Sequence, residues 1–126
     1  MNTDEYLLRI SWNEVCSYLD EIATKLDPHD YSGVYGLPRG GLVLAAWLSH
    51  KLYIPMLHTP DRSCIIIDDI CDSGDGMKKC LEEYGLAENN NCFITTMFLN
   101  KDSTFQNLDY FHRFKGENWI VFPWEK

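Results

Sequence analysis

The chain has 126 residues, of which 45% are hydrophobic, and this length and composition predict a single domain over residues 1–126. Its net charge of −8 argues against nucleic acid as a partner, because binding to a phosphate backbone needs a basic face. No apolar run reaches the roughly 20 residues that cross a bilayer, and the first residues lack the pattern of a signal peptide, so no membrane partner is expected.

The first residues predict a strand followed by an amphipathic helix. Tyr6 to Ile10 is a short apolar segment, which we expect to form a strand. Ser11 and Glu14 fit a capping box, in which the Ser11 hydroxyl accepts a hydrogen bond from the Glu14 amide and the Glu14 side chain reaches back. Apolar residues at helical spacing then predict a helix from Trp12 to about Leu26.

A second strand and helix follow, joined by a turn rich in glycine. Residues 32–37 predict the strand, and Pro38–Gly41 a tight turn. Residues 42–53 are apolar on nearly all sides, which indicates a buried helix. Residues 54–57 are expected to form a short strand, and residues 58–63 a loop.

The rest of the chain continues the alternation of strands and helices. Residues 64–68 are apolar on both faces, as in a central parallel strand. A loop over residues 70–75 precedes a predicted helix at 76–84, which Gly85 ends. Residues 92–99 predict another buried strand. Two short strands are expected late in the chain, at 109–111 and 119–122.

This order of elements predicts an α/β fold: an open, mainly parallel, twisted sheet with helices on both faces. In such sheets, ligands bind beyond the carboxyl ends of the strands. Two unusual loops, at residues 37–41 and 70–75, both follow strands. We therefore expect them to lie together at one edge of the sheet.

The second of these loops has the features of a phosphate site. Small residues from Asp72 to Gly76 leave backbone N–H groups exposed at the start of a helix, and Ser73 adds a hydroxyl. Asp68 and Asp69, at the end of the preceding strand, could accept hydrogen bonds from sugar hydroxyls or hold Mg²⁺ through water. A solvated acidic turn is the alternative for any single aspartate here.

Other motifs with similar residues do not fit. The acidic residues are three apart, whereas a calcium-binding EF-hand needs them two apart. Neither a Walker A sequence nor a GxGxxG dinucleotide loop is present. In the first loop, Arg39 offers a planar fork for phosphate oxygens, although an ordinary turn with a surface arginine is the alternative. Together the two loops indicate a ligand with two separated phosphate groups.

The motifs resemble those of one enzyme family. CIIIDDICDSGDG looks like the phosphoribosyl-pyrophosphate (PRPP) signature of type I phosphoribosyltransferases, and GVYGLPRGGLVLAAWL resembles their pyrophosphate loop. Nearly the whole chain is similar to the xanthine-guanine phosphoribosyltransferase branch, through ISWNEV, FITTMFLNK, LDYF and NWIVFPWE. The resemblance implies the type I fold with a small hood over the base, built from the two ends of the chain.

The resemblance also implies an activity and its cofactor. Such a protein transfers the phosphoribosyl group of PRPP to guanine, xanthine or hypoxanthine, depends on Mg²⁺, releases pyrophosphate and serves purine salvage. The family is commonly dimeric or tetrameric, so a homodimer or homotetramer is expected, with the helix around Trp47 as a candidate contact. The five cysteines, odd in number and without CxxC spacing, fit a reducing cytoplasm better than a disulfide framework or a zinc site.

Roles carry over from the family by position. Asp72 is the candidate base beside N7 of the purine, and Lys101 matches the lysine that reads a 6-oxo group. A one-residue offset in aligning FLNK leaves a solvated loop lysine as the alternative for Lys101. Trp119 matches the aromatic ring that stacks on the base, with a core tryptophan as the alternative, and Ile120 offers its carbonyl. The family often has a cis peptide here between Pro38 and Arg39. The implied PRPP site is Asp68, Asp69, Asp72, Ser73, Gly74, Asp75 and Gly76; the pyrophosphate site is Arg39 and Gly40; the metal site is Asp68, Asp69 and Glu125.

The sequence departs from the family in two places. Gly76 stands where the family usually has a threonine or serine hydroxyl for the phosphate. Relatives also place a long mobile flap between the strands joined here by PMLHTPDRSC, in which only about six residues connect them. A flap excludes water and completes the site. Its absence leaves a second hypothesis open, a PRPP- or nucleotide-binding regulator without catalysis, and a third, a scaffold with a relic site.

Overall fold

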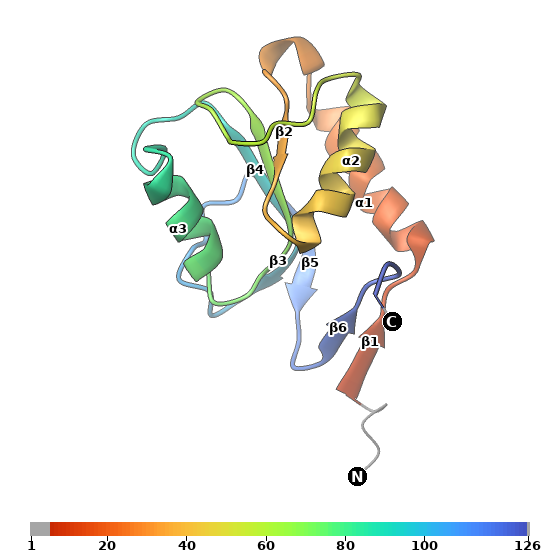
Figure 1. Ribbon diagram of the computed structural model, residues 1–126. Helices are drawn as coiled ribbons and strands as arrows, with labels where there is room; N and C mark the ends of the chain where they lie inside the picture. Colours follow the sequence, from red (N-terminus) through yellow and green to blue (C-terminus); the bar gives the residue numbers. More distant parts are fainter. Residues whose placement is uncertain (1–5, 126) are drawn as a thin grey trace.

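In the computed structural model, which describes residues 6–125, four parallel strands form the central sheet in the order β2-β3-β4-β5. They are β2 (Val34–Gly36), β3 (Ile65–Cys71), β4 (Phe93–Asn100) and β5 (Tyr110–Lys115). A separate two-stranded parallel sheet pairs β1 (Leu7–Arg9) with β6 (Trp119–Val121). It lies beyond the carboxyl ends of the central strands (Figure 1). The predicted α/β class and the small hood are confirmed.

Helices cover both faces of the central sheet. α1 (Trp12–Lys25) and α2 (Gly40–Leu52) lie on one face, and α3 (Asp75–Glu83) lies on the other (Figure 1). A short 3-10 helix, η2 (Pro28–Asp30), follows α1. Among the residues that the structure describes, no helix has the length and hydropathy needed to cross a membrane.

The capping box at the start of α1 is only half formed. The Ser11 hydroxyl accepts a hydrogen bond from the Glu14 amide at 3.1 Å, as predicted. The Glu14 carboxylate does not reach back to Ser11. It contacts β5 instead, with Oε2 3.1 Å from Nε of Arg113 and 3.2 Å from Nε2 of His112. Glu14 therefore connects α1 to the edge strand rather than satisfying the helix start.

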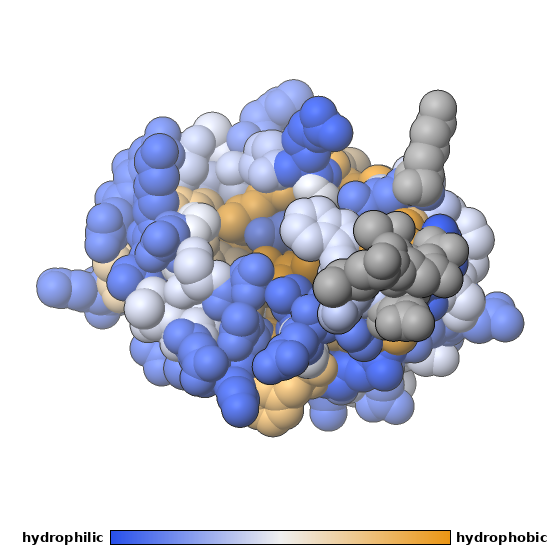
Figure 2. Space-filling model, turned by 90° about the horizontal axis from the view of Figure 1, so that it is seen from below, coloured by the Kyte–Doolittle hydropathy of each residue, from blue (hydrophilic) through white to orange (hydrophobic). Residues whose placement is uncertain are grey.

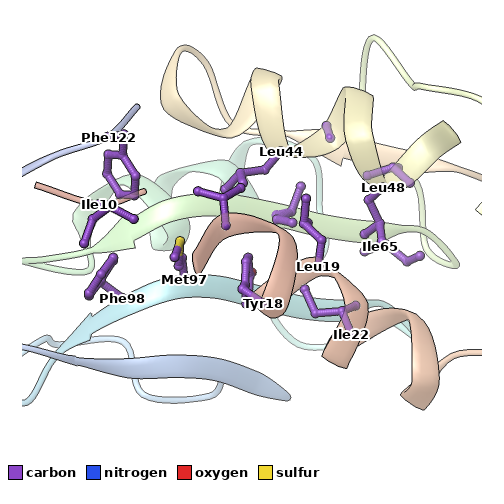
Figure 3. Close-up of a cluster of buried hydrophobic side chains, with 14 of the residues drawn as sticks. Ile10, Tyr18, Leu19, Ile22, Leu44, Leu48, Ile65, Met97, Phe98 and Phe122 are labelled. Atoms are coloured by element: carbon purple, nitrogen blue, oxygen red, sulfur yellow. The ribbon is translucent and has the colours of Figure 1, made fainter. Parts of the chain in front are cut away.

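The core has two halves, separated by the sheet. Ile65 and Ile67 of β3 pack toward α1 and α2, whereas Ile66 packs toward α3, and all three are fully buried. The larger half surrounds Tyr18, whose hydroxyl lies 2.8 Å from Oγ1 of Thr95 in β4 (Figure 3). Burial of each such aliphatic side chain stabilises the fold by about 1.5–3 kcal/mol. This packing fixes β3, the strand that carries the acidic residues.

Three sequence expectations need correction. α2 is not buried on all sides, because Leu42 and Trp47 remain 43% and 42% exposed, with Trp47 stacked on Trp12 at a ring distance of 5.9 Å. Residues 54–57 form no strand; Met56 makes a single bridge with Val34. β3 and β5 both run further than expected.

Candidate active site

The carboxyl ends of the central strands face the hood, and the two unusual loops meet there. Seen from this edge, the molecule has a depression with hydrophobic residues at its floor and mainly hydrophilic residues around it (Figure 2). Three neighbouring cavities line the edge, with volumes of about 160, 250 and 570 Å³. Asp72 borders the first and the second, and Asp69 borders the second and the third. The cavities are therefore adjoining parts of one site.

Asp68 and Asp69 lie within β3, near its carboxyl end, rather than in a loop. The Asp68 carboxylate accepts a hydrogen bond from the Asp69 amide at 2.8 Å, and the Asp69 carboxylate accepts one from the Ile70 amide at 2.7 Å. Burial raises the pKa of the Asp68 carboxyl to about 8, and the neighbouring Asp69 charge adds to this rise. Asp68 is thus a carboxyl that a cation or a hydrogen-bond donor in the cavity would help to ionise.

The first cavity lies at the loop for which a phosphate cradle was predicted. Its lining includes Asp68, Asp72, Ser73, Gly74 and Gly76, whereas the Asp75 side chain is exposed and does not line it. Gly74 has φ +92°, and a Cβ there would lie 2.6 Å from the amide nitrogen of Phe105. A side chain at this position would therefore push the cradle away from the loop beneath it.

That underlying loop supports the cradle directly. The Ser73 carbonyl accepts hydrogen bonds from the amide and the hydroxyl of Thr104, at 2.8 and 2.9 Å. The Ser73 hydroxyl itself accepts from the Asp75 amide at 3.2 Å, at the start of α3. The cradle is held from both sides, with its free backbone N–H groups at a helix N-terminus, which suits an anion.

The second cavity lies between Asp72, the candidate general base, and the hood. It is lined by Asp72 and Lys115 on one side, and by Trp119, Ile120 and Glu125 on the other. Trp119 is 70% exposed, unlike a core tryptophan, so one face of its ring is free to stack on a planar ligand. Asp72 is held in place, because its Oδ1 accepts a hydrogen bond from Nδ2 of Asn100 at 2.8 Å and lies 3.6 Å from Nζ of Lys115.

The lysine in this cavity is not the one that the sequence indicated. Lys101 lies in the exposed turn after β4 and is not among the residues that line the cavity. Lys115 ends β5, directly across from Asn100 at the end of β4. Sequence reasoning missed both residues, since β5 was expected to end at Phe111. The register of β4 and β5 is the signal that identifies them.

The third cavity joins the first loop to the end of the chain. Arg39, Gly40 and Val43 line it together with Asp69 and Glu125. The peptide bond between Pro38 and Arg39 is cis, as the resemblance implied. A Cβ on Gly40 would lie 2.0 Å from Oδ2 of Asp69, so a side chain at this position would displace the Asp69 carboxylate. Glu125 is oriented by the hydrogen bond that its Oε1 accepts from the Phe122 amide at 2.9 Å.

A metal ion would find only part of a site in the protein. No group of three or more histidine, cysteine, aspartate or glutamate side chains converges on one point within residues 6–125. Mg²⁺ is usually held by one or two carboxylates together with substrate phosphates and water. Asp68 and Asp69 fit that pattern, and so does Glu125 across the third cavity.

The fold is that of type I phosphoribosyltransferases. A purine phosphoribosyltransferase from Pyrococcus horikoshii superposes with a TM-score of 0.80 over 95% of both chains, at 26% identity. A xanthine-guanine-hypoxanthine phosphoribosyltransferase from Helicobacter pylori superposes with a TM-score of 0.74 over 94% of this chain and 93% of its own, at 16% identity. The parallel sheet, the loops and the hood therefore form one shared architecture.

The sequence shows a more particular relationship. A xanthine-guanine phosphoribosyltransferase of Idiomarina loihiensis is 25% identical over 142 aligned residues, which cover 92% of this chain and 85% of the relative. The chain matches no protein-family model. It is nevertheless similar to xanthine-guanine phosphoribosyltransferases along nearly its whole length.

Proposed function

We propose that this protein transfers the phosphoribosyl group of PRPP to a 6-oxopurine and releases pyrophosphate. The single observation that carries the proposal is the continuity of the three cavities. In this proposal the cavity beside Ser73 and Gly74 takes one phosphate group, the cavity with the exposed Trp119 takes the base, and the cavity lined by Arg39 takes the second phosphate group. PRPP carries two separated phosphate groups and the purine supplies the planar ring, so the two substrates together offer one part to each cavity.

The residues support a division of labour during the transfer. As the bond to pyrophosphate breaks, positive charge develops on the ribose, and the carboxylates of Asp68 and Asp69 stabilise it. Arg39 binds the departing pyrophosphate oxygens. Asp72, positioned by Asn100 and Lys115, accepts the proton from the purine ring nitrogen.

We propose Mg²⁺ as the cofactor, which Asp68, Asp69 and Glu125 would hold together with the substrate. When bound, it would neutralise charge on the pyrophosphate leaving group. Purine salvage in the cytoplasm and a dimeric or tetrameric assembly go with this proposal. All five cysteines are free thiols, which fits a reducing compartment.

Product formation tests the proposal most directly. The protein is incubated with PRPP and Mg²⁺ and, in separate reactions, with guanine, xanthine, hypoxanthine, adenine or orotate, and nucleotide formation is followed. We expect product with at least one 6-oxopurine and little with adenine or orotate. PRPP binding without product from any base would reject catalysis.

That second outcome would favour a PRPP- or nucleotide-binding regulator, and one observation supports this alternative. The alignments to the relatives span 140–142 residues, longer than this 126-residue chain, so the relatives carry insertions. In this structure Asp61 to Ser63 close the short connection before β3, where the Ser32 amide binds the Ser63 carbonyl at 2.9 Å. The connection is short and is held by this hydrogen bond, so it cannot extend over the site.

Lys115 is expected to select bases that carry a 6-oxo group. Its ammonium group lines the base pocket and can donate to a carbonyl oxygen, but not to the amino group of adenine. We expect Lys115→Met to lower kcat/KM for the preferred 6-oxopurine roughly 10²-fold or more, because a charged hydrogen bond in a pocket is lost. Lys101→Met is the matched control and should change kcat/KM little. The reverse result would restore Lys101 as the reading residue.

Gly76 offers a position where affinity for PRPP can be raised. A Cβ there meets no heavy atom within 4 Å, and Gly76 is the second residue of α3 beside the phosphate cradle. Gly76→Thr adds the hydroxyl donor that the family usually has. We expect the KM for PRPP to fall about tenfold, since a hydrogen bond to a charged group contributes roughly 1.5–3 kcal/mol. Gly76→Val, similar in shape but without the hydroxyl, should not show this fall.

A further inference from the structure

Two cysteines lie side by side at the edge of the sheet opposite the proposed active site. Cys64 immediately precedes β3 and Cys92 immediately precedes β4, and their sulfur atoms are 3.9 Å apart. Ile65 and Phe93, the next residues, are paired in the parallel register of these strands. Neighbouring strands run about 4.8 Å apart, which is within the range of Cα separations that a disulfide spans.

We propose that Cys64 and Cys92 form a redox-active dithiol, a modification site that a small-molecule disulfide oxidises to a reversible intramolecular bond. The proposal does not depend on the phosphoribosyltransferase activity.

The two sulfur atoms have different access to solvent, which assigns them different roles. Cys64 is fully buried, whereas Cys92 is partly exposed. An oxidant in solution can therefore reach Cys92 but not Cys64. The hydrogen bond from Cys64 lowers the pKa of the Cys92 thiol to about 7 and so favours the thiolate, the reactive form.

The reaction is a thiol–disulfide exchange in two steps. The Cys92 thiolate attacks one sulfur of the small disulfide, forming a mixed disulfide and releasing one thiolate. The Cys64 sulfur then attacks the Cys92 sulfur, and its proton passes to the departing sulfur of the mixed disulfide. This forms the internal bond and releases the second small thiol. The protein loses two electrons and two protons, and the small disulfide is reduced to two thiols.

The surroundings link this bond to the short connection that precedes β3. Both sulfur atoms lie within hydrogen-bond distance of the Asp61 carbonyl oxygen, at 3.4 Å for Cys64 and 3.1 Å for Cys92. The Asn91 amide also binds the Arg62 carbonyl at 2.7 Å. The connections before β3 and β4 are thus already docked on each other, so closing the bond requires little movement of the backbone.

The test treats the native protein with oxidised glutathione and compares it with two variants. We expect the wild type to lose two hydrogen atoms by intact mass, to retain no glutathione, and to give a Cys64–Cys92 cross-linked peptide. The Cys16→Ser variant is the control, because Cys16 is the other partly exposed cysteine but takes no part in the proposed bond. It should form the Cys64–Cys92 bond as the wild type does. The Cys92→Ser variant should form no internal bond.

Stability provides an independent measurement on the same samples. A bond that closes the segment between Cys64 and Cys92 restricts the unfolded chain, so the oxidised wild type should have a Tm higher by roughly 5 °C or more. Dithiothreitol should reverse this shift. A stable glutathione adduct on Cys92 in the wild type, or a Cys92 that stays unmodified while Cys16 reacts, would overturn the proposal.

Discussion

Replacing Asp72 by asparagine is expected to lower the rate of phosphoribosyl transfer by about 10²–10⁴-fold, the contribution of a positioned general base. Asparagine keeps the shape of the side chain, and its oxygen can still accept the hydrogen bond from Asn100 that is 2.8 Å long in the wild type. It cannot accept a proton from the purine. Steady-state kinetics should therefore show a loss in kcat, and PRPP binding measured by calorimetry should be nearly unchanged.

The control for Asp72→Asn is Asp102→Asn. This substitution removes the same charge. Asp102 is exposed and lies in the neighbouring loop after β4. Its backbone amide donates a hydrogen bond to Oδ1 of Asn100 at 2.9 Å, and changing the side chain leaves that contact in place. If Asp72→Asn kept wild-type turnover, Asp72 would not be the base. If both variants lost activity, a general effect of charge would explain the result.

Replacing Asp68 by asparagine is expected to stabilise the fold while weakening its function. In the folded protein, burial raises the pKa of Asp68 to about 8, whereas an aspartate in the unfolded chain has a pKa near 3.9. Between these two values the folded state binds more protons than the unfolded state, so this carboxyl lowers stability as the pH rises from about 4 to about 8. Asparagine cannot ionise and avoids that loss.

The pH dependence makes this second prediction specific. The gain in free energy of unfolding for Asp68→Asn should be close to zero near pH 4 and should reach roughly 2 kcal/mol or more by pH 8. Urea unfolding at several pH values measures it, with Asp102→Asn as the exposed control. The variant should bind PRPP with Mg²⁺ more weakly. A gain that did not vary with pH would show that Asp68 is already ionised in the folded protein.

Several parts of the fold and site could be predicted because a local pattern carries the information. The three isoleucines of β3 place apolar side chains on both faces of the strand, as is typical of a central parallel strand. The glycines and small residues around Ser73 likewise indicate a tight turn that leaves backbone N–H groups exposed at the start of a helix. Ser11 also indicated the start of α1. The Glu14 side chain, however, contacts His112 and Arg113, and Arg113 lies 99 residues further along the sequence, so no local pattern could indicate this contact.

The base pocket could be predicted less well, since it depends on register between strands that are distant in sequence. β5 is an edge strand with half-exposed aromatic and charged residues, so its alternation is weak and its end was placed too early. Lys115 therefore fell outside every predicted element. The strand predicted at residues 54–57 was wrong for a different reason. The apolar character of this segment suits a strand, yet in the structure Met56 makes a single bridge with Val34.

The pairing of β1 with β6 gives the site an order of assembly. Leu7 lies beside Trp119, so the hood closes a contact that spans nearly the whole chain. The phosphate cradle, by contrast, is built between β3 and α3, which are adjacent in sequence. Contacts that close long loops form late and lose more entropy when they form. The phosphate cradle should therefore form early in folding. The pocket that discriminates between bases should form only when β6 has paired with β1.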